Sequence, residues 1–305
     1  MLNTIKSVGS TLVHSMFLRN SAQDIYEWLG DDVVEGTSEH FAKTEKPLWL
    51  NLGYWENAQT YPEAARALAT LLGDAAQLNS KDHQLDVGFG LAEQDFFWLE
   101  KYNVAHITGL NITPMHVERA RKRVTERGLE SRISLGLGSA TATPFLNETF
   151  TKVTALECAF HFVTREIFFQ EAFRVLKPGG RLAIADAGPA EGTPAEKPGL
   201  AARWALRHFA TPVANYYDRN EFKRKLEQAG FVNVQMRSIG HFVNPHYQRY
   251  DKMRHAGVPM EKAVVQPIPQ AERDTWQARW GKLGMLTDYM IISADKPAAP
   301  GGRLC

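Results

Sequence analysis

Two glycines separated by one residue follow a short apolar stretch in the first third of the chain. Leu85-Asp86-Val87 predicts a strand, Gly88-Phe89-Gly90 a tight turn, and the residues around Phe96 a helix. A strand, a glycine turn and a helix N-terminus together bring backbone N–H groups close to a bound ligand. The stretch therefore predicts a ligand-binding loop.

Glu93 stands where a dinucleotide-binding loop has its third glycine. A carboxylate at that position would repel a pyrophosphate, which disfavours NAD and FAD. No Gly-Lys-Ser/Thr follows the turn, so a nucleotide P-loop is excluded. The loop is expected to bind a ligand without a pyrophosphate.

A second group of residues that could do chemistry follows the predicted strand Lys152 to Leu156. His161 is the first candidate for a general base, because imidazole titrates near neutral pH. Glu157 is a second candidate base, or a residue that organises the site. The alternative for His161 is a packed side chain hydrogen-bonded to backbone, and Cys158 is interpreted as a small packed residue.

Short apolar strands alternate with helices through the middle of the chain. Strands are expected at 85–87, 105–110, 133–137, 152–156, 181–186, 231–239 and 289–294, and helices at 61–78, 113–128, 165–176 and 221–230. Lys177-Pro178-Gly179-Gly180 predicts a turn after the helix that ends near Leu176. The alternation indicates an α/β fold with a doubly wound, parallel sheet. Because such sheets bind ligands beyond the carboxyl ends of their strands, the residues to inspect are 88–93, 111, 139, 157–161 and 186.

Composition narrows the class of protein. The 305 residues are 44% hydrophobic and 23% charged with a formal net charge of +1, which is ordinary for a globular protein. The balance gives no reason to expect nucleic acid or an anionic membrane as a partner. Two cysteines far apart fit a reducing compartment such as the cytoplasm. No run approaches the ~20 apolar residues of a membrane span, and Val8 to Leu18 is interpreted as a cap helix rather than a signal segment.

Four motifs, in order and at the right spacing, resemble class I S-adenosylmethionine-dependent methyltransferases over about residues 50–240. They are Leu85 to Gly90, Gly109-Leu110-Asn111-Ile112-Thr113, Gly138-Ser139-Ala140 with Pro144-Phe145, and Arg174 to Gly180. Asn51 to Trp55, together with Leu156 to Phe162, is similar to the branch that includes tocopherol, sterol and natural-product methyltransferases.

The resemblance implies a Rossmann-like methyltransferase sheet whose last strand is antiparallel, and S-adenosyl-L-methionine as the cofactor. The cofactor-binding residues implied are Tyr54, Trp55, Asp86, Gly88, Gly90, Glu93, Asn111, Ile112, Ser139, Ala140 and Glu157. The glycine turn suits the cofactor's carboxylate, and the two acidic residues of the loop suit its ammonium group. An aromatic face of Tyr54 or Trp55 could lie over the sulfonium, although packing against the core is the alternative.

Three residues depart from the family pattern. Ala92 replaces the third motif glycine, Asn111 the acidic residue that binds the ribose hydroxyls, and Ser139 the aspartate beside the adenine amino group. Asn111 and Ser139 can still hydrogen-bond those groups, but as neutral partners.

The predicted organisation is a methyltransferase core with additions. Residues 1–60 are expected to form an N-terminal helical cap and aromatic lid, 61–297 the core, and 298–305 a tail. Aromatic-rich insertions at 187–219 and 240–284 predict helical cap segments that bind the acceptor. The alternative for the second insertion is a homodimer contact. No metal site is expected, since the histidines lack ligand spacing.

The predicted function is transfer of a methyl group to a small, partly apolar metabolite of secondary or isoprenoid metabolism, by in-line displacement. One alternative is a cyclase or pericyclase of the same fold that retains the cofactor. The other is a non-catalytic cofactor-binding scaffold, which the three departures would favour. The methylated atom cannot be read from these residues.

Overall fold

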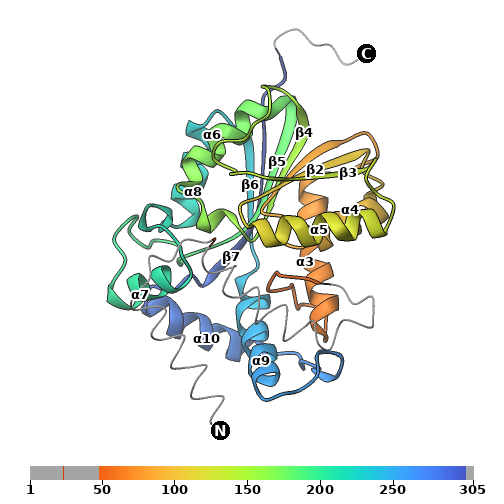
Figure 1. The fold of residues 1–305 in the computed structure, drawn as a ribbon. Coiled ribbons are helices and arrows are strands. Elements are labelled where there is room, and N and C mark those ends of the chain that lie inside the picture. Colours follow the sequence, from red (N-terminus) through yellow and green to blue (C-terminus); the bar gives the residue numbers. More distant parts are fainter. Residues whose placement is uncertain (1–22, 24–47, 300–305) are drawn as a thin grey trace.

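A computed structural model describes residue 23 and residues 48–299, which build one seven-stranded sheet flanked by helices (Figure 1). The strand order is β3-β2-β1-β4-β5-β7-β6. The strands are β1 (His83–Val87), β2 (His106–Asn111), β3 (Ile133–Leu137), β4 (Phe150–Leu156), β5 (Leu176–Gly188), β6 (Val232–Ser238) and β7 (Asp288–Asp295).

The directions of the strands confirm the predicted fold class. β1 pairs in parallel with β2 and β4, and the parallel pairing continues to β3 and β5. β7 is antiparallel to both of its neighbours, β5 and β6. The sheet is therefore a mostly parallel, Rossmann-like sheet with an antiparallel last strand. Helices cover both faces, which explains why the central strands β4 and β7 are buried along most of their length.

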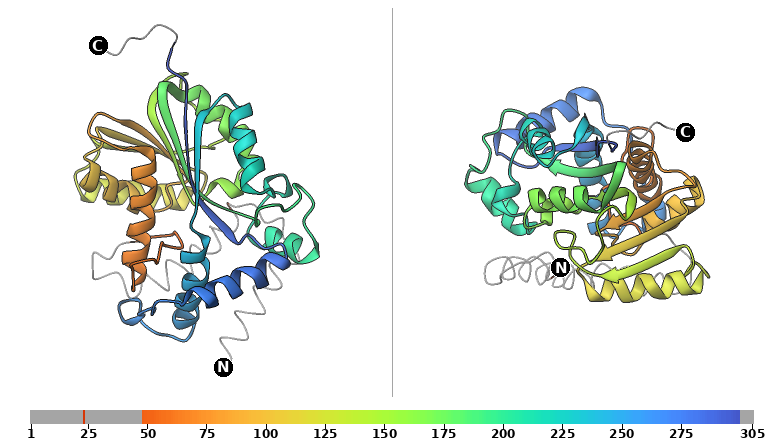
Figure 2. Two further views of the ribbon diagram at one scale, coloured as in Figure 1. Left: turned by 180° about the vertical axis from the view of Figure 1, so that it is seen from behind. Right: turned by 90° about the horizontal axis from the view of Figure 1, so that it is seen from above.

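Helices pack on the sheet in two layers, seen from behind and from above in Figure 2. The buried side chains of α3 (Tyr61–Ala76), α4 (Glu93–Tyr102) and α5 (Pro114–Glu126) join one core cluster. Those of α6 (Arg165–Val175) and α8 (Arg219–Gln228) join the cluster on the opposite face. Both layers leave the carboxyl ends of β1 to β4 free to form a site.

Local signals in the sequence account for where the helices begin. Thr60 and Glu63 form a reciprocal capping box at the start of α3, and Tyr61 is followed by proline in the first turn. Thr113 precedes α5, which begins at Pro114, a residue whose fixed φ suits the first helical position.

One predicted turn falls inside a strand. Lys177-Pro178-Gly179-Gly180 lies within the bounds of β5, between Leu176, which pairs with Phe150, and Arg181, which pairs with Lys152. The register shifts between these two pairs, Gly179 adopts φ +77°, and its N–H donates to the carbonyl of Lys296 over 3.0 Å. The two glycines therefore allow an irregular stretch of backbone at the point where β5 begins.

Both insertions contain helices, as predicted. The first holds α7 (Leu200–His208), and the second holds α9 (Asn244–His255) and α10 (Gln270–Lys282). The cap expected over 1–60 falls mostly outside the described residues, as does the helix expected at 8–18. Within the described part of the chain, no helix is long and apolar enough to cross a membrane.

Candidate active site

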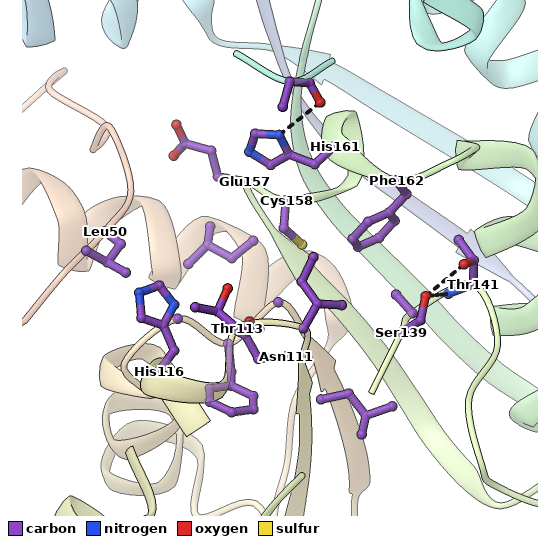
Figure 3. Close-up of a pocket in the computed structure, with 18 of the residues that line it drawn as sticks. Leu50, Asn111, Thr113, His116, Ser139, Thr141, Glu157, Cys158, His161 and Phe162 are labelled. Atoms are coloured by element: carbon purple, nitrogen blue, oxygen red, sulfur yellow. Dashed lines mark hydrogen bonds between the residues drawn. The ribbon is translucent and has the colours of Figure 1, made fainter. Parts of the chain in front are cut away.

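A cavity of 430 Å³ opens at the carboxyl ends of β1, β2, β3 and β4 (Figure 3). It brings together eight of the residues predicted from the sequence to form the site: Gly88, Gly90, Asn111, Ile112, Ser139, Ala140, Glu157 and His161. These residues come from four separate strand ends, and the parallel order of the sheet alone gathers them at one edge. Four other predicted residues, Tyr54, Trp55, Asp86 and Glu93, do not line this cavity.

The glycine turn leaves no room for side chains at its two glycines. Gly88 and Gly90 have φ values of +72° and +57°. A Cβ at Gly88 would lie 2.6 Å from Cβ of Cys158, and one at Gly90 would lie 2.9 Å from Leu50. The N–H of Gly88 donates to the carbonyl of Leu110, so it is not free for a ligand. Within the described chain, the N–H groups of Gly90 and Leu91 have no hydrogen-bond acceptor.

Asp86 stabilises this turn through hydrogen bonds. It is fully buried, and its carboxylate accepts hydrogen bonds from Gln94 at 3.0 Å and Thr154 at 2.7 Å. Gln94 also donates to the carbonyl of Phe89 in the turn. Asp95 lies next to Asp86, and burial raises the pKa of both carboxyl groups. The pair therefore holds protons at a pH at which exposed aspartates have lost theirs.

Glu93 faces away from the cavity, because other groups bind its carboxylate. Oε2 pairs with the guanidinium of Arg123 and accepts the N–H of Leu48 at 3.0 Å. The sequence predicted that the charge of Glu93 would repel a pyrophosphate. Because Arg123 neutralises that charge, repulsion by Glu93 is not a valid reason to disfavour NAD or FAD. Glu93 instead joins the start of α4 to α5.

Ala92, the irregular member of the loop, keeps a glycine-like backbone. Its φ is +61°, and its methyl group is fully buried in the core cluster beside α4. Burial of the methyl group offsets part of the cost of ~1–2 kcal/mol for a left-handed conformation in a residue with Cβ. The turn therefore keeps its shape without the third glycine.

Asn111 and Ser139 end β2 and follow β3 at the cavity wall. Oδ1 of Asn111 accepts the N–H of Thr113 at 3.0 Å, which directs the role of ligand donor to its Nδ2 group. The hydroxyl of Ser139 lies 2.8 Å from that of Thr141 (Figure 3). Ile112 is 40% exposed at the rim of the cavity.

Glu157 follows β4 with a left-handed φ of +56° and lines the cavity. Its Oε2 accepts the N–H of Leu52 at 2.8 Å and the hydroxyl of Tyr289 at 3.1 Å. Burial raises the pKa of Glu157 to about 8, although both hydrogen bonds stabilise its charged form. The carboxyl group is thus poised to change charge close to physiological pH.

His161 lines the cavity four residues further on. Its Nδ1 lies 3.4 Å from the carbonyl of Ala210 (Figure 3), a contact that fits a proton on Nδ1. Burial lowers the pKa of His161 to about 4, so the ring is neutral at pH 7. Cys158 between them donates its thiol to the carbonyl of Val87, and burial raises its pKa, which keeps it a packed thiol.

Tyr54 and Trp55 pack against the second insertion rather than over the cavity. The Tyr54 ring meets Phe242 edge-on at 5.7 Å, and its hydroxyl binds Glu56 and Arg237. The Trp55 ring lies 5.9 Å from that of Tyr250. Both side chains are buried in the core. The same segment reaches the cavity through residues 48, 50 and 51 instead.

The first insertion contributes a wall of the cavity through residues 206, 207 and 210–212. Among the described lining residues, none comes from 240–284. Asn215 fastens the insertion to the segment after β4, because its amide donates to the carbonyls of Phe160 and Phe162 at 3.0 and 2.7 Å. Arg165, ion-paired with Asp186 at 2.8 Å and fully buried, anchors the same junction. Asp186 is thus a structural partner of Arg165.

Several other lining residues were not among those predicted to form the site. They include Gln94, His116, Thr141 and Val163, together with Thr113 and Phe162, which belong to segments that carry the family resemblance. His116 is buried on the inner face of α5, and burial lowers its pKa to about 4. The one available clue was helical spacing, which places residues 113, 116, 117 and 120 on one face of α5.

The fold and the site define a class of enzyme. Residues 57–184 match the family model of a methyltransferase domain. The structure of the cyclase SpnF superposes with a TM-score of 0.68 at 21% identity, covering 92% of this chain and 98% of that one, which shows the shared fold.

Two methyltransferases of known activity are similar to this chain over most of its length. Erythromycin 3''-O-methyltransferase from Saccharopolyspora erythraea is 37% identical over 284 residues, which are 90% of this chain and 89% of the relative. The 27-O-demethylrifamycin SV methyltransferase from Amycolatopsis mediterranei is 26% identical over 84% of this chain and 94% of its own. The chain belongs to the class I S-adenosylmethionine-dependent methyltransferases that act on small molecules.

The residues of the cavity fit this cofactor. The N–H groups of Gly90 and Leu91, which have no acceptor among residues 48–299, lie just before α4 and suit a carboxylate. The Nδ2 group of Asn111 suits a hydroxyl, and the hydroxyl of Ser139 suits an amino group. A methyl group added at Gly88 or Gly90 would collide with Cys158 or Leu50, two residues that line the cavity.

Proposed function

We propose that this enzyme methylates a hydroxyl oxygen of a partly apolar natural product. The observation that carries the proposal is the position of His161, a neutral imidazole that lines the cavity beside the glycine turn. Two relatives whose names specify O-methylation, or an O-demethyl substrate, support oxygen as the methylated atom.

S-adenosylmethionine, when bound, supplies an electron-poor methyl carbon. The chain's own residues must then hold the acceptor and accept one proton. As its oxygen is alkylated, the acceptor hydroxyl becomes strongly acidic and its proton passes to Nε2 of His161. A base with a pKa of about 4 is sufficient for so acidic a proton. The carbonyl of Ala210 fixes the tautomer by accepting from Nδ1.

Glu157 is the second candidate base. Two neutral donors hold its Oε2, so Oε1 is the oxygen left to meet a ligand in the cavity. A carboxyl group with a pKa of about 8 carries little charge at pH 7 until a cation lies beside it. We infer that Glu157 gains its charge when the cationic cofactor binds and then orients the cofactor or the acceptor.

Two groups of predicted cofactor residues take different roles in this proposal. Direct contact is assigned to Gly88, Gly90, Asn111, Ile112, Ser139, Ala140 and Glu157, which all line the cavity. Asp86 and Glu93 act indirectly, through Gln94 and Arg123. Tyr54 and Trp55 hold the segment that carries Leu50 to the cavity rim.

We also propose that 187–219 is the acceptor-binding insertion, that the enzyme works in the cytoplasm, and that it forms a homodimer. Residues 206, 207 and 210–212 at the cavity support the first proposal. The low cysteine count supports the second. Light scattering after gel filtration tests the third, which a monomer at micromolar concentration would refute.

Incubation with S-adenosylmethionine and demethylated acceptors tests the function. We expect 3''-O-demethylerythromycin or 27-O-demethylrifamycin SV to gain one methyl group on oxygen. Methylation at carbon or nitrogen would contradict the proposal while leaving the enzyme class intact.

A further inference from the structure

α7 belongs to the insertion that lines the cavity (Figure 1). Large apolar side chains on one of its faces are exposed to solvent. Leu200 is 89% exposed and Trp204 is 58% exposed, at positions i and i+4 of the helix. Arg207 follows Trp204 by three residues, so the three side chains lie on one face. We call Leu200, Trp204 and Arg207 the α7 stripe.

The stripe is not needed to hold α7 in place. The opposite face of the helix buries Ala202, Ala205 and Leu206, two of which pack with Tyr216 in a small separate cluster. The Trp204 ring stacks on that of His208, with centroids 5.4 Å apart and planes at 8°. A large, flat, exposed aromatic surface on an anchored helix is a feature of binding sites.

The stripe is continuous with the cavity. Arg207 belongs to the stripe and also lines the cavity, next to Leu206. Its guanidinium makes no hydrogen bond or ion pair with any side chain in the described chain. Val163 also lines the cavity while remaining 71% exposed. The stripe therefore adjoins the cavity at Arg207.

The size of the cavity requires such a surface. Its 430 Å³ lies toward the lower end of the ~300–1,000 Å³ typical of small-molecule sites, and it must admit the cofactor as well as the reacting group. An acceptor as large as those that the relatives' names specify cannot fit beside the cofactor. Most of such an acceptor must lie outside the cavity.

We propose that the α7 stripe is the acceptor platform: Leu200 and Trp204 bind the apolar bulk of the acceptor, and Arg207 donates to one of its oxygens at the mouth. The inference rests on the proposed function, because it assumes a bulky, oxygen-bearing acceptor. It assigns acceptor specificity to residues that do not take part in the chemistry.

Trp204→Ala tests the platform, with Trp204→Phe as the conservative variant and Leu146→Ala as the matched control. Leu146 is 82% exposed and precedes β4, so it lies near the amino end of that strand, whereas the cavity lies at the carboxyl end. Steady-state kinetics with 3''-O-demethylerythromycin and 27-O-demethylrifamycin SV, and calorimetry with S-adenosylhomocysteine, are measured for each variant. We expect Trp204→Ala to raise the acceptor KM roughly tenfold and to leave kcat and the cofactor Kd unchanged. Trp204→Phe and Leu146→Ala should resemble the wild type.

Each other outcome decides against one part of the account. A wild-type acceptor KM in Trp204→Ala would overturn the platform and leave the methylation intact. A change of oligomeric state with unchanged KM would make the stripe a subunit contact instead. If the wild-type enzyme binds a probe without methylating it, the proposed function fails, and the platform stands only if Trp204→Ala weakens that binding. If it binds neither probe while it still binds the cofactor, the platform is wrong.

Discussion

Oε2 of Glu157 accepts a 2.8 Å hydrogen bond from the backbone N–H of Leu52, 105 residues earlier in the chain. The contact joins the aromatic segment before α3 to the end of β4. The Glu157 carboxyl group, whose pKa is raised, is therefore bound directly to the segment that reaches the cavity rim. Events at the cofactor site are expected to reach this segment through Glu157.

Glu157→Gln should make the protein more stable at alkaline pH. The folded-state pKa of Glu157 is raised to about 8, so the folded state binds a proton that the unfolded state has lost above about pH 4.5. Stability is therefore lost as pH rises from 4.5 to 8. Glutamine removes this loss, and we expect a gain of a few kcal/mol at pH 9. Urea unfolding at pH 5 and pH 9 measures it; an equal effect at both pH values would refute the raised pKa.

Asp95→Asn should also stabilise the enzyme, by a different route. Both carboxyl oxygens of Asp95 are buried beside the Asp86 carboxyl group, and within the described chain no other group hydrogen-bonds them. An asparagine amide could donate to the Asp86 carboxylate and carries no charge to desolvate. We expect about 1–2 kcal/mol at pH 8. Glu100→Gln, on the same helix, is the control, and a lower melting temperature for Asp95→Asn would contradict the prediction.

Gly88→Ala should weaken cofactor binding and destabilise the fold more than Gly128→Ala. Both glycines have positive φ, but a Cβ at Gly88 meets Cys158 at 2.6 Å, whereas one at Gly128 meets nothing within 4 Å. The shared backbone strain costs about 1–2 kcal/mol, and the clash adds about 1–3 kcal/mol at position 88 alone. Thermal unfolding and calorimetry with S-adenosylhomocysteine provide the comparison. Equal losses in the two variants would show that Cys158 does not constrain the turn.

His161→Ala should lower kcat by about 10²–10⁴-fold with little change in cofactor affinity, because the lost group acts only on the acceptor proton. His255→Ala, on the exposed side of α9, should behave as the wild type.

The pH profile of kcat/KM separates the two candidate bases. If His161 is the base, activity rises through pH about 4 and is flat near neutrality. If Glu157 must be ionised in the free enzyme, activity rises through pH about 8. The second profile, together with full activity in His161→Ala, would transfer the role of base to Glu157.

The sequence predicted the sheet and the strand ends at which the cavity lies, because both depend on local patterns. Strand–turn–helix signals place Gly88, Asn111, Ser139 and Glu157 after successive strands, and a parallel sheet brings such positions together. The cofactor loop and His161 followed from the same reasoning. The sequence predicted that the insertion at 187–219 binds the acceptor, but it did not indicate which of its residues line the cavity.

The misplaced side chains depend on distant partners that no local pattern reveals. Glu93 turns away because Arg123, thirty residues later, binds it. Tyr54 and Trp55 turn away because Phe242 and Tyr250 supply a better apolar environment. Lys177 to Gly180 were predicted as a turn, but Leu176 and Arg181 on either side pair with β4, and Gly179 donates to the residues that follow β7, so the stretch lies within β5. In each case a contact with a residue distant in the sequence determines the orientation of the side chain or the path of the backbone.

The most direct test of the account is a single reaction with S-adenosylmethionine that carries a trideuterated methyl group. Wild-type and His161→Ala enzymes are incubated with 3''-O-demethylerythromycin and with 27-O-demethylrifamycin SV, and products are analysed by mass spectrometry and carbon NMR. We predict that the wild-type enzyme places one trideuteromethyl group on a hydroxyl oxygen and that the variant does so far more slowly. A rearranged product without the label, formed while the cofactor stays intact, would contradict methyl transfer and identify a cyclase.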